Sequence, residues 1–536
     1  MRFFPLSIVL IISLYLFPSV SNSQNRRDVI IPKPVSVEYT EQRAFKIPKR
    51  ITLYTSDCQS ESDYFKSEIQ DSQGIEVRNV RKSRTADILM SVAPEIVKKN
   101  EGYKLIVDKK KITIIGHDNA GVFYGVQSLL QLFYASRESK VIESQVISDS
   151  PAFSWRAFML DEARHFQGEK EVYRLLDEMA ALKMNKIHWH LTDNEGWRIE
   201  IKKYPKLTEI GSIRKDTQMG DRKSEKTKGS PHSGFYTQAD IKRILQYAKK
   251  RHIRIIPEIE MPGHASAAIA SYPFLGSSDE KIEVPIKFGA HLAVFNVADQ
   301  RVIHFLQDVL DEVFTLFQTD IIHIGGDEVR YNQWKVNKAI NEWKDKNQLA
   351  SYKDFQVYFT NQMSKYIQSK GKRMMGWNEI LGQGSEHKDN DVSSGNSNQR
   401  LADNVIVHFW QGNQQKAIQA AKDGYDIVNS YRKFTYLDYD YESISLEKAY
   451  SFSPIPEGMP KEFEYKILGV GCQLWTEWID EPKKLNYQVF PRIAAISEVG
   501  WTSNERKDYT DFLLRLKYFT DRWKRKNITY GTVVSE

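Results

Sequence analysis

The chain has 536 residues, of which 41% are hydrophobic and 12% aromatic, and its formal net charge is +7. This length exceeds one ordinary small domain and suits a large barrel with an accessory domain. Lys and Arg are scattered and form no concentrated basic stripe, so we expect no nucleic-acid partner.

The N-terminal segment has the pattern of a signal peptide. Arg2 precedes an apolar stretch that ends at Val20, and small polar residues follow. We therefore expect residues 1–23 to be removed and the protein to be exported, periplasmic or secreted from a bacterium, with no stable membrane association. A single-pass signal anchor is the alternative, which the prolines in the stretch disfavour. With Cys58 and Cys472 as its two cysteines, the chain is not a disulfide scaffold.

Residues 24–149 predict a small α+β accessory domain. The apolar runs 103–107 and 112–115 flank a lysine-rich turn and indicate a hairpin. Residues 119–133 carry apolar side chains at helical spacing. Strands followed by a helix packed on one face are typical of such a domain, and the turn-forming residues 148–151 mark its end.

Residues 150–536 alternate between apolar strands and amphipathic helices, which predicts a (β/α)₈ TIM barrel. The expected strands are 156–160, 186–191, 254–259, 321–324, 373–377, 405–410, 426–430 and 468–474. The expected helices include 169–183, 238–251, 300–317, 352–369 and 414–423. A doubly wound open sheet is the alternative, but no glycine-rich phosphate loop follows the first strand.

Three local signals refine this expectation. Thr237 and Asp240 predict a capping box at the start of one helix. The polar segments Arg214–Gly234 and Gly382–Asn398 interrupt the alternation, and we expect both to be long mobile loops at the mouth of the barrel. Plain disorder is the alternative for them.

The most informative stretch is His323–Glu328, where Asp327 and Glu328 follow an apolar strand and two glycines. Gly325 and Gly326 allow a close backbone approach and an unusual turn. When two carboxylates share a site, their pKa values move apart, so that one is ionised and the other protonated near neutral pH. Acid-assisted cleavage of a glycosidic bond requires such a pair. The alternative is a salt-bridged acid pair at the start of a loop.

The carboxyl ends of the other expected strands carry polar and aromatic residues. They are Asp161, Arg164, His188, His190, Asp193, Glu260, His264, Trp377, Glu379, Trp410, Tyr436, Asp438, Trp475 and Glu477. Aromatic faces pack on a pyranose and charged groups bind its hydroxyls, so this set predicts a sugar pocket at the barrel mouth. Any one of these tryptophans taken alone is better explained as core.

Metal chemistry is the rival interpretation of this pocket. His188 and His190 lie on one strand face, and His264 and His323 stand at other strand ends. A lone His-x-His is a weak motif, and we prefer to interpret His188 as a hydrogen-bonded core histidine.

A series of motifs in order along the chain carries a family resemblance. The motifs are Ile31–Pro34, Gly116–Gln127, Asp161–Phe166, His188–Asp193, Gly196–Glu200, Pro257–His264, His323–Glu328, Gly376–Glu379 and Gln473–Glu477. Through them essentially the whole mature chain resembles the family 20 glycoside hydrolases, the β-N-acetylhexosaminidases. The resemblance implies the TIM barrel with its accessory domain, and no metal or cofactor.

The resemblance also implies that the substrate supplies the nucleophile, because in this family the 2-acetamido carbonyl attacks the anomeric carbon and forms an oxazolinium ion. It implies that Glu328 is the general acid and then the base, and that Asp327 orients the acetamido nitrogen. It further implies that Tyr436 donates its hydroxyl to the acetamido oxygen. The substrate-binding residues that it implies are Arg164, Asp193, His264, Trp377, Trp410, Asp438, Trp475 and Glu477. Of these, Asp193 and His264 match positions that in the family support the acid and line the pocket.

The expected function is therefore that of an exo-acting, retaining β-N-acetylhexosaminidase, which releases terminal N-acetylglucosamine or N-acetylgalactosamine from glycans or chitooligosaccharides. A non-catalytic carbohydrate-binding protein on the same scaffold is the alternative. Glu195, Glu260, Asn378 and Gln411 depart from the residues usual in the family, and Glu195 and Gln411 leave the aglycone preference open. The sequence also leaves open the sugar preference, the linkage and the oligomeric state.

Overall fold

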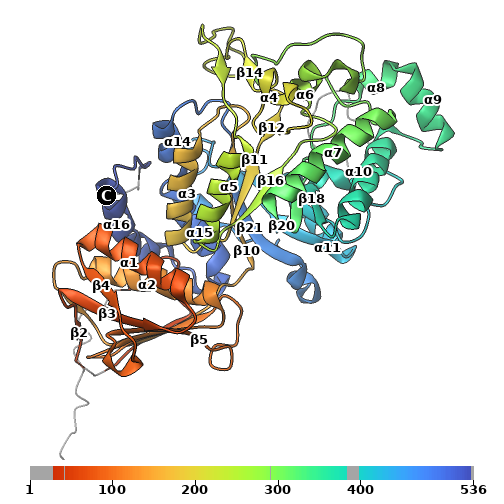
Figure 1. The fold of residues 1–536 in the computed structure, drawn as a ribbon. Helices are drawn as coiled ribbons and strands as arrows, with labels where there is room; N and C mark the ends of the chain where they lie inside the picture. Colours follow the sequence, from red (N-terminus) through yellow and green to blue (C-terminus); the bar gives the residue numbers. More distant parts are fainter. Residues whose placement is uncertain (1–27, 41–42, 290, 383–396, 533–536) are drawn as a thin grey trace, which may run out of the picture.

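The computed structural model describes residues 28–40, 43–289, 291–382 and 397–532, which form two domains in chain order (Figure 1). The N-terminal domain, drawn in red and orange, is a seven-stranded sheet with two helices. The remaining residues form a closed eight-stranded barrel with helices around it. Within the described residues, no helix combines the length and the apolar character needed to cross a bilayer. The predicted signal peptide lies outside the described residues.

The sheet of the N-terminal domain has the order β1-β9-β6-β7-β5-β3-β4. Its strands are β1 (Ser36–Tyr39), β3 (Arg50–Thr55), β4 (Glu76–Asn79), β5 (Ile88–Val92), β6 (Tyr103–Val107), β7 (Ile112–Gly116) and β9 (Gln145–Asp149), and β2 (Phe45–Lys46) pairs separately with β8 (Val141–Ile142). The predicted hairpin is confirmed as the antiparallel pair β6–β7.

Helices α1 (Gln59–Gln73) and α2 (Asn119–Ala135) lie between this sheet and the barrel (Figure 1). The Asp118 side chain caps α2 by accepting from the Gly121 amide. Every residue of α2 from Gly121 to Leu129 is buried, because one face packs on the sheet and the other reaches the barrel domain, where Tyr124 meets Trp501 in an edge contact.

A buried ion pair joins the two domains. Lys183 Nζ lies 3.1 Å from Asp149 Oδ2, and both side chains are fully buried. The Tyr103 hydroxyl and the Trp501 indole N–H also donate to Asp149, at 2.8 and 2.9 Å. The pair and its two further donors are shielded from water only while the domains are in contact, so their geometry fixes how the accessory sheet is aligned on the barrel domain.

The barrel follows the order β10-β11-β16-β17-β18-β19-β20-β21 and confirms all eight predicted strands. The strands are β10 (Trp155–Asp161), β11 (Lys186–His190), β16 (Arg254–Glu258), β17 (Ile321–His323), β18 (Arg373–Trp377), β19 (Ile406–Phe409), β20 (Asp426–Asn429) and β21 (Ile467–Leu474). Neighbouring strands pair in parallel, as in β10 with β11 and β21. These continuous apolar runs are buried on both sides, which is what a helix-covered parallel sheet requires.

Helices occupy the connections between the strands. They are α3 (Glu169–Ala181), α4 (Lys206–Glu209), α5 (Gln238–Lys249), α6 (Ser266–Ser271), α7 (Gln300–Phe317), α8 (Asn332–Val336), α9 (Lys338–Lys346), α10 (Tyr352–Ser369), α11 (Gln415–Lys422), α12 (Arg432–Thr435), α13 (Leu446–Ser451), α14 (Pro482–Val489), α15 (Arg492–Trp501) and α16 (Tyr509–Arg525). The predicted bounds of α7 and α10 are confirmed to the residue, and so is the capping box of Thr237 and Asp240.

The segment Arg214–Gly234 is more ordered than a plain loop. The short strands β14 (Ile213–Arg214) and β15 (His232–Ser233) pair across its base, and the Gln218 side chain donates to the Ser224 carbonyl at 2.7 Å. Residue-local patterns do not reveal strands of two residues, because distant hydrogen bonds hold them. Residues 383–396 of the second predicted loop lie outside the described residues.

Candidate active site

A pocket of about 640 Å³ opens at the carboxyl ends of the barrel strands. It is lined by Arg164, Arg222, His264, Gly289, Asp327, Glu328, Trp410, Arg432, Tyr436, Asp438, Tyr439, Asp440, Ser443, Trp475, Glu477, Trp478, Ile479 and Gln488. Nine of the eleven residues predicted for the site are among them, and Asp193 and Trp377 are not. The predicted meeting of distant strand ends in one pocket is therefore confirmed for most of the set.

The pair Asp327–Glu328 enters the pocket from a sharp turn after β17. Gly325 and Gly326 take positive φ angles of 66° and 91°, and Glu328 one of 46°. This left-handed backbone breaks the strand alternation that would send neighbouring side chains to opposite faces. Both acids consequently line one pocket, with Asp327 buried and the Glu328 side chain 27% exposed.

Asp327 is prepared to accept a hydrogen bond. Its Oδ1 is buried and has no hydrogen-bond partner among the described residues. Burial raises the pKa of Asp327 to about 7, although nearby His264 opposes the rise and Glu379 and Glu328 add to it. A buried carboxylate oxygen without a donor is costly, so a ligand N–H placed there would be strongly favoured.

Aromatic rings form the walls of the pocket. Trp410 and Tyr436 lie nearly parallel, with an interplanar angle of 9° and centroids 5.9 Å apart. Trp475 also lies against Tyr436, with ring centroids 6.1 Å apart and the rings tilted by 52°. Because the Trp410 indole N–H donates to Glu379 at 2.9 Å, its ring orientation is fixed. These faces suit the apolar side of a pyranose.

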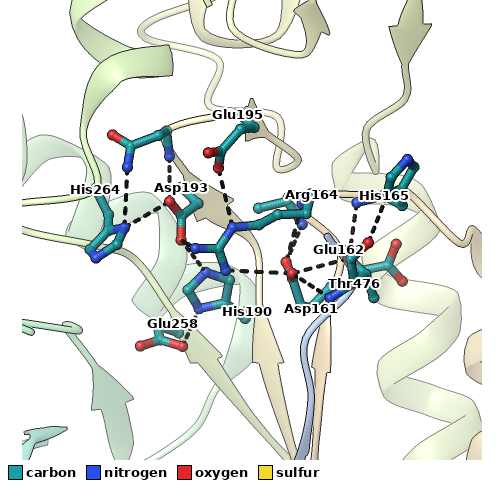
Figure 2. Close-up of polar contacts among 12 residues, drawn as sticks. Asp161, Glu162, Arg164, His165, His190, Asp193, Glu195, Glu258, His264 and Thr476 are labelled. Atoms are coloured by element: carbon teal, nitrogen blue, oxygen red, sulfur yellow. Dashed lines mark hydrogen bonds and ion pairs between the residues drawn. The ribbon is translucent and has the colours of Figure 1, made fainter. Parts of the chain in front are cut away.

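Arg164 lies on the floor of the pocket within a cluster of carboxylates. Its guanidinium lies 3.4 Å from Asp161, 2.8 Å from Asp193 and 3.2 Å from Glu195 (Figure 2). These charges hold the pKa of Arg164 well above its ordinary value despite burial. Glu195, one of the departures from the family pattern, therefore adds an ion pair to the arginine expected to bind sugar hydroxyls.

His264 connects this cluster to the acid pair. Its Nδ1 lies 2.9 Å from Asp193 Oδ1, and its Nε2 lies 3.7 Å from Asp327 and 3.9 Å from Glu328. Burial alone would lower the pKa of His264, but Asp193 and Asp327 raise it to about 10. Asp193 thus contacts the pocket residues from behind instead of lining the pocket itself (Figure 2).

A second pair of acids stands on the opposite wall. Burial raises the pKa of Asp438 to about 8, and the neighbouring charge of Glu477 adds to this rise. Asp438 Oδ1 has no hydrogen-bond partner among the described residues. Carboxyl groups at this wall can accept hydrogen bonds from sugar hydroxyls.

Trp377 lies beneath the pocket and not in its wall. It stacks on His408 with ring centroids 4.2 Å apart and is 1% exposed. Trp377 is not among the residues that line the pocket, but its ring lies against two that are, with centroids 6.3 Å from Trp410 and 5.9 Å from Trp475. A sequence pattern identifies the strand end but not the depth of the side chain below the rim.

Several pocket residues were absent from the sequence prediction. Arg222 comes from the segment that was expected to be a loop, Arg432 begins α12, and Trp478 follows Glu477. Arg432 lies over the Trp410 ring at 5.4 Å. The sequence carries no spacing signal for these residues, since they belong to irregular connections.

Of the histidines considered as metal ligands, His264 lines the pocket, whereas His188, His190 and His323 do not. His188, His323 and His408 bring nitrogen atoms within 4.8 Å of one another, and none of the three lines the pocket. His188 is buried and its Nε2 lies 2.9 Å from Glu258. Neither of its ring nitrogens has the geometry of a hydrogen bond to the described residues, so the predicted burial of His188 is confirmed and its predicted hydrogen bond is not. His323 Nδ1 lies 2.7 Å from the same carboxylate. The charged and aromatic groups that line the pocket are carboxylates, aromatic rings, three arginines and His264.

Comparison with known proteins agrees with this geometry. Residues 153–504 match "Glycosyl hydrolase family 20, catalytic domain", and residues 28–150 match "Glycosyl hydrolase family 20, domain 2". The chain is 37% identical over 84% of its length to a beta-hexosaminidase of Porphyromonas gingivalis and spans 57% of that protein. It is 32% identical over 88% of its length to a beta-hexosaminidase of Vibrio furnissii, of which it spans 76%.

A solved structure is similar over both domains. The exo β-N-acetylglucosaminidase of Vibrio harveyi, determined in complex with N-acetylglucosamine, superposes with a TM-score of 0.79 at 30% identity and covers 94% of this chain and 78% of its own. Together, the barrel, the acid pair and these matches show that the chain belongs to glycosyl hydrolase family 20.

Proposed function

We propose that the protein is an exo-acting, retaining β-N-acetylhexosaminidase that works by substrate-assisted catalysis. It would release terminal N-acetylglucosamine or N-acetylgalactosamine from glycans or chitooligosaccharides. The observation that carries the proposal is the placement of Asp327 and Glu328 in one aromatic-walled pocket, with a buried oxygen of Asp327 lacking a donor among the described residues.

The first step breaks the glycosidic bond. Glu328 gives its proton to the glycosidic oxygen, and the 2-acetamido carbonyl oxygen attacks the anomeric carbon to form a cyclic oxazolinium ion. Asp327 accepts the acetamido N–H and stabilises the positive charge that grows there, while Tyr436 donates its hydroxyl to the acetamido oxygen. Adjacent acids on one turn suit this division of work, because a carboxylate nucleophile would stand across the sugar from the acid.

The second step returns the site to its starting state. Glu328, now a carboxylate, takes a proton from water, which attacks the anomeric carbon and opens the oxazolinium ring. Two displacements at one carbon leave the β configuration retained. Trp410 and Trp475 would hold the apolar ring faces, and Arg164, Asp438 and Glu477 would bind the hydroxyl groups.

A panel of matched aryl β-glycosides tests the proposal. We expect hydrolysis of the N-acetylglucosaminide and the N-acetylgalactosaminide, no comparable hydrolysis of the plain glucoside, and a β-configured first product by NMR. Activity should survive a chelator. Equal rates on the plain glucoside would contradict substrate assistance, and binding of glycans without any hydrolysis would favour the carbohydrate-binding alternative.

We also propose that the protein is exported, on the basis of the apolar segment that ends at Val20. N-terminal sequencing of protein expressed in a bacterial host, after separation of periplasm and medium from cytoplasm, tests this. A product that keeps Met1 and stays in the cytoplasmic or membrane fraction would contradict it.

A further inference from the structure

Glu258, the last residue of β16, is a fully buried carboxylate surrounded by nitrogen atoms. The Trp377 indole N–H donates to Oε1 at 2.8 Å, and His323 Nδ1 lies 2.7 Å from the same oxygen. His190 Nδ1 and His188 Nε2 lie 2.5 and 2.9 Å from Oε2. A buried charge is costly unless it is paired, and here four nitrogens from β11, β17 and β18 surround one carboxylate.

A chain of alternating carboxylates and imidazoles leads from Glu258 through His190 and Asp193 to His264 (Figure 2). His264 in turn lies beside the acid pair. His190 lies between Glu258 and Asp193, with its Nε2 2.9 Å from Asp193 Oδ2. Asp193 Oδ1 lies 2.9 Å from His264 Nδ1, and His264 Nε2 lies 3.9 Å from Glu328. Every member before Glu328 is buried, so bulk water does not screen the series.

In this series, each carboxylate stabilises the positive charge of a neighbouring imidazole, and each imidazole stabilises the neighbouring carboxylate. Burial alone would lower the pKa of His190, but the Glu258 charge and the hydrogen bonds to Asp193 and Glu258 raise it to about 10. A protonated imidazole donates from both nitrogens, which is what two flanking carboxylates require. Asp193 is then held by His190 on one side and by Arg164 on the other, with the Arg164 guanidinium at 2.8 Å.

We propose that Glu258 is a positioning residue for the general acid Glu328 and that it acts through His190, Asp193 and His264. This inference rests on the proposed function. Glu258 keeps His190 protonated and oriented, His190 fixes the Asp193 carboxylate, and Asp193 presents the His264 Nε2–H to the acid pair. When Glu328 loses its proton to the leaving oxygen, the cation of His264 stabilises the new carboxylate. Atoms of Glu258 itself never touch the substrate.

The leaving group provides the test. A dinitrophenyl aglycone departs without protonation, whereas a methoxyphenyl aglycone needs the acid. Glu258→Gln keeps the side-chain shape but loses the charge that holds His190. We expect it to lower kcat for the methoxyphenyl N-acetylglucosaminide by about tenfold or more, the size of one lost charge-assisted hydrogen bond. For the dinitrophenyl substrate we expect a loss of about threefold or less, with KM within about twofold for both.

Glu178→Gln is the matched control. Glu178 is also a buried carboxylate, 1% exposed, and it accepts from the Trp523 indole and from Arg522. It lies in α3 on the outside of the barrel and is not among the described residues that line the pocket. Any loss of activity in Glu178→Gln should therefore be the same for both leaving groups.

Two further variants keep the test decisive. His190→Gln removes the imidazole that contacts Glu258. The loss of kcat in this variant should depend on the leaving group as it does in Glu258→Gln, and His190→Gln can be measured even where Glu258→Gln does not fold. In a Glu328→Gln background, Glu258→Gln should cause little further loss of kcat on the methoxyphenyl substrate, because the effects of residues that act through one group are not additive.

The proposal is overturned if Glu258→Gln and His190→Gln lower kcat by the same factor on both substrates. It is also overturned if Glu258→Gln lowers kcat on the methoxyphenyl substrate as much in the Glu328→Gln background as in wild type. Either result would make Glu258 a support of the barrel core alone. These ratios are taken relative to wild-type protein on the same substrates. A wild-type protein that hydrolyses neither substrate would instead refute the proposed function.

Discussion

The carboxylate of Glu260 fills the space in front of Gly325, because its Oε2 lies 1.8 Å from the point where a Cβ on Gly325 would stand. Burial raises the pKa of Glu260 well above its ordinary value, and the charges of Asp327 and Glu258 raise it further. Burial and these neighbouring charges favour the protonated form of Glu260. Two features therefore require a glycine at position 325. One is its φ of 66°, and the other is the Glu260 carboxyl group packed against it.

Gly325→Ala should disable the enzyme and destabilise it. The new methyl would displace Glu260, and a non-glycine residue at this φ costs about 1–2 kcal/mol by itself. We expect kcat/KM to fall by about 100-fold or more, because sub-ångström errors at the reacting groups are costly. Thermal unfolding and steady-state kinetics measure both effects.

Gly371→Ala is the control for that substitution. Gly371 has a similar φ of 69°, but nothing lies within 4 Å of its Cβ position. It should show the loss in unfolding temperature that the backbone angle alone causes, with kcat/KM unchanged. Equal activity losses in the two variants would contradict the role assigned to Glu260.

Substitution of the two acids should separate their roles. Glu328→Gln removes the proton donor and should lower kcat by about 10²–10⁴-fold on substrates with a poor leaving group, with a smaller loss on dinitrophenyl substrates. Asp327→Asn should lower kcat on N-acetylated substrates with either a poor or a good leaving group. The reason is that it disturbs the attack of the acetamido oxygen on the anomeric carbon and not the protonation of the leaving group. Asp320 is exposed and directly precedes β17, the strand that leads to the acid pair. Asp320→Asn should leave kcat unchanged on every substrate. A loss for Asp327→Asn that varied with the leaving group would contradict this division.

The buried pair between the domains should control the stability of the whole chain. Asp149→Asn leaves the Lys183 ammonium buried without its counter-charge, which costs about 3–5 kcal/mol. We expect a lower midpoint in denaturant and easier proteolysis of the accessory domain. Arg50→Gln breaks an exposed ion pair with Glu76 in the same domain and should leave the midpoint unchanged. A small effect of Asp149→Asn would mean that other contacts between the domains, such as the ion pair of Arg156 with Glu101, suffice to hold them together.

Glu178 should make stability depend on pH in the acid range. Burial alone would raise its pKa, but the positive charges of Arg522 and Lys526 lower it to about 2. The folded carboxylate thus loses its proton more readily than the unfolded one, whose ordinary pKa is 4.5. Its contribution is present above about pH 4.5 and is lost as the pH falls towards 2.

The comparison of wild type with Glu178→Gln measures this linkage. At pH 7 the variant should be less stable by about 3–5 kcal/mol. The difference should shrink as the pH falls below about 4.5, because the wild-type carboxylate then gains its proton. A difference in the free energy of unfolding that stays constant from pH 7 to pH 3 would contradict the assignment.

Much of the fold could be predicted because its signals are local. The apolar runs of the eight barrel strands and the spacing of helices such as α7 and α10 are visible in short windows. The ribbon at Ile213–Arg214 and His232–Ser233 was missed, because each strand has two residues and depends on a partner far along the chain.

The candidate site likewise contains residues that the sequence predicted and residues that it did not. Asp327, Glu328 and His264 stand in motifs at strand ends, and the pocket contains all three. The depth of Trp377 below the rim could not be read from its position, because it depends on how the strands tilt and close into the barrel. The same holds for Arg222 and Arg432, which irregular connections carry to the mouth.

The sequence by itself determined the barrel, the accessory domain and the residues able to carry out the chemistry, because periodicity and residue type act over a few positions. Only the tertiary structure decided which charges meet. Glu258, His190, Asp193 and His264 come from different parts of the chain. They form one buried series because closure of parallel strands brings the carboxyl ends together at distances of 2.5 to 2.9 Å.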